Sequence, residues 1–363
     1  MRPICVLLLV CFNTLLCLTS CVDPVDLTLV SSNDILVVEG TITNLAEPQI
    51  FRLNRSRADP LTGRFGTTPI SQAILNVIED STRVITGHET VAGSYQLPAD
   101  FKGTIGHTYQ LRFILSTGEE YQSTVQKMPA VPPIERVHAR FNPISLNSNL
   151  LQGFTAAHDI YLDAQDPANE LNYYRWDWKL WETQGWCRSC VQGLYSVNNV
   201  LTRFSSNGFR YFTAGDSLLE NCFYPPADYP GVNSYFVYDY SCRTQCWALF
   251  YSYELNVFSD AYTNGGSIRG QKVAQIPFYQ HSPCLVEIRQ AALSAPAYAY
   301  FKQLADQTQK TGGVADTPPT ALSGNIHPIK TDREGIVGYF TASAISTTRY
   351  WLDRKDAQGV SFG

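Results

Sequence analysis

The sequence has few charged residues and none of the short motifs that mark common catalytic or phosphate-binding sites. Aspartate, glutamate, lysine and arginine make up 16% of its 363 residues, and the formal net charge is −5. A mildly acidic chain without basic blocks binds nucleic acid poorly, so we expect no nucleic-acid partner. Its six histidines are not paired at metal-ligand spacing, and it has neither an H-E-x-x-H motif nor a glycine-rich phosphate loop. The sequence therefore predicts no catalytic residue, no metal site and no cofactor.

After residue 20 the sequence also lacks the roughly 18 consecutive apolar residues that a transmembrane helix needs. Its first twenty residues instead follow the pattern of a signal peptide, with Arg2 ahead of the apolar stretch Ile4–Leu18. That stretch ends in Leu18-Thr19-Ser20-Cys21, the residue order of a bacterial lipobox. We expect cleavage before Cys21 and lipidation of its thiol, since several acyl chains together make a stable anchor. The alternative is an ordinary secreted protein whose Cys21 joins a disulfide.

The residues after the predicted cleavage site indicate where the anchored protein resides. Residues 21–34 form a short polar tether. An aspartate directly after the lipidated cysteine favours inner-membrane retention in some bacteria, but Val22 occupies that position. We therefore expect an outer-membrane lipoprotein whose body faces the periplasm or the cell surface.

Six further cysteines all lie in the second half of the chain. They are Cys187, Cys190, Cys222, Cys242, Cys246 and Cys284. An even number in an exported protein predicts disulfides, although the sequence does not choose their pairing. Cys187 and Cys190 also form a Cys-x-x-Cys pair after a tryptophan, as in thioredoxin-like oxidoreductases, but the flanking residues predict strands rather than the required helix. A zinc site built from two such pairs is a weaker alternative, because exported thiols are usually oxidised before they meet zinc.

The remaining pattern predicts a mainly β fold in two parts. Short alternating segments separated by turns indicate an immunoglobulin-like β-sandwich over residues 35–130. The clearest strand is His107–Leu115, with Tyr109, Leu111, Phe113 and Leu115 on one face. The proline-rich segment Met128–Pro133 marks the boundary. Residues 131–363 predict a larger β-rich domain with disulfides and one or two helices. One helix is expected to begin at Ser294, a good capping residue, with Pro296 in its first turn. Its inner face is expected to carry Tyr298, Phe301, Leu304 and Ala305.

Two groups of aromatic residues are candidates for ligand contact. Trp176 and Trp178 alternate with charged residues and share one face with Tyr174 and Leu180, which fits either a binding platform or the core face of a sandwich. The second group lies in a tyrosine- and proline-rich segment that predicts a loop, where binding residues are common. Its members are Tyr224, Tyr229 and Tyr235.

Several short strings, in a shared order, make the chain resemble a known family. They are Leu36–Asn44, Thr108–Leu111, Pro132–Ile134, Tyr173–Trp176, Val286–Gln290, Ala297–Lys302, Gly324–Ile326 and Gly338–Ser343. The chain resembles the Bacteroidota outer-membrane lipoproteins known as domain of unknown function 4249. The resemblance implies a gene setting beside TonB-dependent transporters, whose accessory lipoproteins capture ligand above the barrel. It carries no catalytic residues.

We therefore expect a non-enzymatic outer-membrane lipoprotein that serves a TonB-dependent transporter as a ligand-binding or docking accessory. Its partners would be the membrane, through lipid on Cys21, and the transporter. Two alternatives stay open. One is an exported thiol oxidoreductase that uses Cys187 and Cys190, and the other is a structural surface or adhesion lipoprotein.

Overall fold

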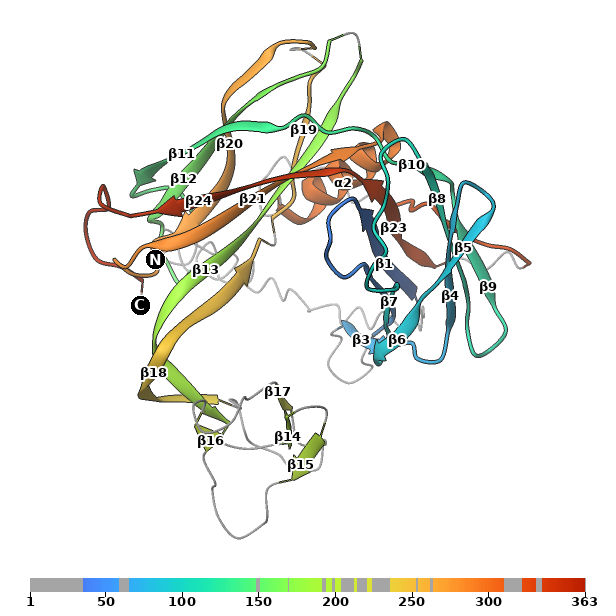
Figure 1. Cartoon of the computed structure of the whole chain (residues 1–363), viewed down its shortest axis with the longest axis horizontal. Helices are drawn as coiled ribbons and strands as arrows, with labels where there is room; N and C mark the ends of the chain where they lie inside the picture. Colours follow the sequence, from blue (N-terminus) through green and yellow to red (C-terminus); the bar gives the residue numbers. More distant parts are fainter. Residues whose placement is uncertain are drawn as a thin grey trace, which may run out of the picture.

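The computed structural model confirms the predicted mainly β fold, which consists of two sandwiches, an extended arm and one described helix (Figure 1). It describes residues 35–58, 65–147, 151–168, 170–190, 194–197, 200–203, 212–213, 221–223, 236–252, 254–261, 264–309, 322–330 and 335–362. The predicted signal peptide, Cys21 and the tether lie outside these residues. No described helix is long and apolar enough to cross a bilayer.

The first sandwich is made of two sheets that enclose one core. One sheet has the order β23 (Ile336–Ser343), β1 (Ile35–Thr43), β2 (Ile50–Ala58), β7 (Ser94–Gln96) and β6 (His88–Val91), with β3 (Phe65–Pro69) on β2. The other has the order β22 (Ile326–Pro328), β9 (Glu120–Ser123), β8 (Thr108–Ile114), β4 (Ile74–Glu79) and β5 (Arg83–Thr86), with β10 (Gln126–Lys127) on β8.

Strand β8 shows how the sequence builds this core. Tyr109, Leu111 and Phe113 are all at most 1% exposed, whereas Arg112 and Ile114 between and beyond them face solvent. Successive side chains of a strand point to opposite faces, so this alternation turns one face of the sheet inward. The predicted strand at His107–Leu115 is therefore confirmed, together with the face that it buries.

The C-terminal part of the chain returns to the first sandwich. β23 pairs in parallel with β1, and β22 pairs antiparallel with β9. Glycine is required where these strands cross, because a Cβ on Gly324 or on Gly338 would lie 1.9 Å from a backbone oxygen. Asn325 then bridges the two strands by accepting from the Phe340 N–H at 2.8 Å and donating to the Phe340 carbonyl at 2.9 Å. Strands β22 and β23, which the sequence placed in the second part, thus complete the sheets of the first.

The second sandwich packs a three-stranded sheet against a larger one, here called the β13 sheet. The three-stranded sheet has the order β11 (Ile134–Asn142), β12 (Ala157–Gln165) and β20 (Ser267–Pro277). The β13 sheet joins β13 (Tyr173–Cys190), β21 (Cys284–Leu293) and β24 (Ile345–Leu352), with β18 (Phe236–Tyr251), β19 (Asn256–Ser259) and β16 (Phe212–Thr213) on β13. Alternate residues of β13 enter the shared core, among them Tyr174, Trp176 and Leu180.

Strands β13 and β18 leave the sheet as a long arm (Figure 1). The pairing of β13 with β21 ends at Glu182, whereas its pairing with β18 continues to Cys190. We call residues 183–190 and 236–247 the arm. Beyond it lie the short strands β14 (Leu194–Val197), β15 (Val200–Arg203) and β17 (Asn221–Phe223).

Helix α2 (Ala295–Gln309) begins where the sequence predicted. Ser294 caps it, because its Oγ accepts from the Ala297 N–H at 3.4 Å. Of the four residues expected on its inner face, Phe301 and Ala305 are buried, while Tyr298 and Leu304 are partly buried. Ala297 and Tyr300 complete the buried face, which packs on Tyr339 and Leu293.

Candidate functional site

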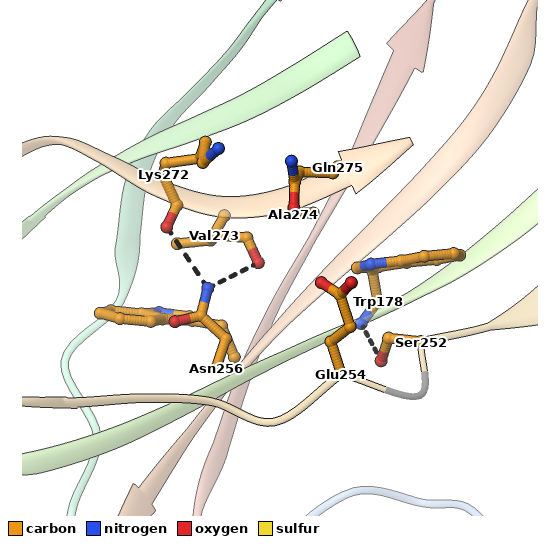
Figure 2. A pocket seen from close by; sticks show the side chains of 9 residues that line it. Trp178, Ser252, Glu254, Asn256, Lys272, Val273, Ala274 and Gln275 are labelled. Atoms are coloured by element: carbon orange, nitrogen blue, oxygen red, sulfur yellow. Dashed lines mark hydrogen bonds between the residues drawn. The ribbon is translucent and has the colours of Figure 1, made fainter. Parts of the chain in front are cut away.

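A small pocket opens where the ladder between β13 and its neighbours is interrupted (Figure 2). β18 ends at Tyr251, opposite Lys179, and β19 begins at Asn256, opposite Trp176, so more residues lie between the two strands than on the facing part of β13 and the ladder forms a bulge. Trp178 and Ser252 hold the bulge: the Ser252 N–H donates to the Trp178 carbonyl at 3.0 Å, and the Trp178 N–H donates to Ser252 Oγ at 3.1 Å. The pocket lies between this bulge and the edge of β20.

The rim of the pocket is polar, and its floor is aromatic. Asn256 ties the rim to β20 by donating from Nδ2 to the carbonyls of Val273, at 3.1 Å, and of Lys272, at 3.3 Å. The exposed Glu254 and the side chain of Gln275 stand on either side of the opening (Figure 2). Trp178 lies at the floor.

The size of the pocket limits what it can hold. Its cavity volume is about 40 Å³, which is room for a few water molecules and not for a whole sugar ring. The lining includes the exposed carboxylate of Glu254 and the side-chain amide of Asn256. The pocket is therefore suited to contact one polar group of a larger ligand.

The structure places the predicted tryptophans in the core of the second sandwich. Trp176 is 1% exposed, and Trp178 is 9% exposed. The indole N–H of Trp176 donates to Gln290 Oε1 at 2.9 Å, and Gln290 in turn donates to the carbonyl of Pro132, so this ring is held in one orientation. Both tryptophans also line the pocket, but neither offers an open face for stacking. The other candidates, Tyr224, Tyr229 and Tyr235, lie outside the described residues.

Sequence reasoning missed the polar rim of the pocket. Glu254, Asn256, Lys272 and Gln275 are separated along the chain and belong to no motif. They come together because β20 passes beside the interrupted edge of β13, an arrangement that depends on sheet pairing.

The cysteines do not form the predicted disulfide framework among the side chains that the structure describes. Cys284 is a fully buried free thiol, and burial raises its pKa to about 12. A thiol with so high a pKa is a poor nucleophile at neutral pH. The expectation that Cys284 joins a bridge is therefore corrected: it packs in the core of the second sandwich as a small apolar residue.

The other cysteines are only partly described. Cys187 and Cys190 lie in the strand β13, not at the helix N-terminus that lowers the pKa of a catalytic thiol. Cys246 is half-buried on β18. The side chains of Cys187, Cys190, Cys222 and Cys242 lie outside the described part, and so does Cys21.

One buried carboxylate pair stands out electrostatically. Asp166 and Asp260 are 2% and 0% exposed, and Tyr174 donates from its hydroxyl to Asp166 Oδ1 at 2.6 Å. Burial raises the pKa of Asp260, and the hydrogen bond and charge of Asp166 raise it further. The backbone N–H of Gly265 also donates to Asp166, at 3.0 Å. The pair thus ties the turns after β12 and β19 together.

The protein is mainly β and consists of two linked sandwiches. Strands from the C-terminal part of the chain return to the first sandwich, and an arm extends from the second. Among the described residues, no group of three or more histidine, cysteine, aspartate or glutamate side chains has the geometry of a metal site. The chain belongs to the family described as Domain of unknown function (DUF4249), whose model matches residues 22–349. This match confirms the resemblance. No curated protein and no solved structure matches the chain.

Proposed function

We propose that this protein is an outer-membrane lipoprotein, anchored through Cys21, that docks on a TonB-dependent transporter as an accessory to ligand capture. The lipobox and the family membership support the location and the kind of partner. The pocket supports contact with one polar group of a ligand.

The arm is the observation that carries the docking proposal. An isolated two-stranded ribbon is marginally stable in water, because it buries little apolar surface of its own. β13 and β18 nevertheless stay paired from Lys179–Tyr251 to Cys190–Phe236 while they leave the body of the sandwich (Figure 1). A partner that covers the arm accounts for a ribbon of this length.

Removal of the arm is the test of this proposal. Gln184 and Cys246 are paired directly across the ribbon, so Asn-Gly in place of residues 185–245 closes it with a two-residue turn. We expect the shortened protein to fold and to reach the membrane, but to lose the transporter. The measurement is affinity isolation of the tagged, lipidated protein from native membranes, followed by mass spectrometry of the proteins recovered with it.

The matched control is Val84→Ser, which changes an apolar side chain on the first sandwich that is 60% exposed. This variant is expected to recover the transporter as the unmodified protein does. Equal recovery with and without the arm would show that the arm is not the docking element.

A further inference from the structure

The outer face of the β13 sheet carries a continuous apolar row beside the arm. Paired residues of neighbouring strands point to the same face of a sheet. The register places Leu249 opposite Trp181, Trp181 opposite Leu285, and Leu285 opposite Trp351. One row of four large apolar side chains therefore crosses the sheet from β18 to β24.

Two further aromatic side chains lie in the rows on either side of this one. Trp247 lies on the same face and meets the Trp351 ring edge to face, with 6.3 Å between the ring centroids. The next row begins at Tyr251, opposite Lys179. We call this set the aromatic patch. It consists of Trp181, Trp247, Leu249, Tyr251, Leu285 and Trp351.

In the part of the chain that the structure describes, no element packs on the patch, whereas the rest of the same face is covered. Helix α2 packs over the far end of the face, near Tyr173, and Glu47 of the first sandwich contacts its middle through Arg289. At the near end Trp351 is 54% exposed and Tyr251 is 56% exposed. Monomeric soluble proteins rarely leave such a group of large apolar side chains in water without a use for it.

We infer that the aromatic patch seats on the surface of a phospholipid bilayer. Tryptophan and tyrosine are the residues that gather at the headgroup level of membranes, because each joins an apolar ring to a polar N–H or O–H. Arg349 lies over the Trp181 ring at 5.8 Å and is exposed at the edge of the patch, where a guanidinium can meet lipid phosphate. The neighbouring Glu287 is mostly buried and is bound by Arg349 at 3.1 Å, so it presents little free negative charge.

The predicted tether between Cys21 and β1 limits the distance between the patch and the membrane. Ile35 begins β1 and is the fourteenth residue after Cys21. Fully extended, this tether spans at most about 45–50 Å. A body tethered so closely meets the bilayer continually, and weak insertion of a few aromatic rings is then enough to orient it. This step rests on the anchor that is part of the proposed function.

Vesicle binding without the lipid anchor tests the inference. The mature chain with Cys21→Ser is mixed with sucrose-loaded vesicles of phosphatidylethanolamine and phosphatidylglycerol, and the fraction that sediments gives the partition coefficient. We expect measurable partition, and a loss of about tenfold when Trp247→Ser and Trp351→Ser remove two exposed rings. Quenching of tryptophan fluorescence by brominated lipid gives a second readout. It uses the Cys21→Ser chain with all its tryptophans and needs no tryptophan variant.

The control variant carries Val84→Ser and Val91→Ser, two exposed apolar positions away from the patch, and is expected to partition normally. Equal partition of the tryptophan variant and the parent chain, without quenching, overturns the inference. A tryptophan variant that loses a dimer or the transporter but still binds vesicles overturns it too, because the patch then binds protein. The chain with Asn-Gly in place of residues 185–245 keeps both Trp247 and Trp351, so its partition is expected to persist even where the transporter proposal fails.

Discussion

Replacement of Arg354 by methionine is expected to lower the free energy of unfolding by about 3–5 kcal/mol, the cost of stranding a buried charge. The side chains of Arg354 and Glu182 are 0% and 3% exposed and form a two-pronged ion pair. Arg354 also donates to the carbonyls of Gln280, at 2.8 Å, and Ser282, at 3.0 Å. Without the guanidinium, the described residues leave the Glu182 carboxylate the amide of Gln280 as its donor. Urea unfolding measures the loss.

Two matched variants separate a buried charge from a general loss of packing. Lys355→Met removes a neighbouring cation that is 85% exposed, and a change within about 0.5 kcal/mol is expected. The double variant Glu182→Leu with Arg354→Met removes both charges and should recover most of the stability. A double variant no more stable than Arg354→Met alone would contradict this reading of the pair.

Replacement of Arg289 by methionine is expected to cost about 2–3 kcal/mol and to loosen the contact between the two sandwiches. Arg289 is 7% exposed and reaches Glu47, on the loop after β1, and Asp177 on β13. The cost is smaller than for Arg354 because Glu47 and Asp177 keep contact with solvent, which screens them. Urea unfolding measures the loss of stability. The control is Arg52→Met, which removes the guanidinium of an exposed ion pair with Glu39. An equal effect of the two substitutions would contradict the prediction.

The same contact has a pH signature. The hydrogen bond from Arg289 holds the pKa of Glu47 below its ordinary value of 4.5. A carboxylate with a lowered pKa in the folded protein stabilises it above that ordinary value, and the stabilisation is lost as the pH falls through the lower, folded-state pKa. The difference in stability between the native chain and Glu47→Gln should thus be full at about pH 6 and shrink below about pH 4. A difference that is constant with pH would exclude Glu47 as its source.

Local patterns predicted those features that depend on neighbouring residues. The alternation around Tyr109 and Phe113 identified both a strand and its buried face, because side-chain direction in a strand repeats every second residue. Ser294 and Pro296 identified the start of α2 for a similarly local reason, the capping of its first turn.

The pairing of strands that are distant in the sequence could not be predicted from local patterns. The return of β22 and β23 to the first sandwich joins strands about 200 and 300 residues apart, respectively, and no local period encodes that crossing. Glu182 and Arg354 look like two unrelated charges until β13 and the turn after β24 are brought together. Cys284 was predicted to join a disulfide because the number of cysteines after Cys21 is even. Its environment is instead an apolar core. The candidate site was half predicted, since its tryptophans follow a local period and its polar rim does not.

Photo-crosslinking in living cells tests the central claim, docking through the arm, most directly. A photoreactive amino acid is placed at Gln245, an exposed position on β18 at the base of the arm, and separately at Val91, which is 64% exposed on the first sandwich. Docking predicts a covalent adduct with a TonB-dependent barrel from Gln245 and none from Val91, after irradiation, affinity isolation and mass spectrometry. Adducts from Val91 alone, or no barrel adduct from either position, would contradict the account.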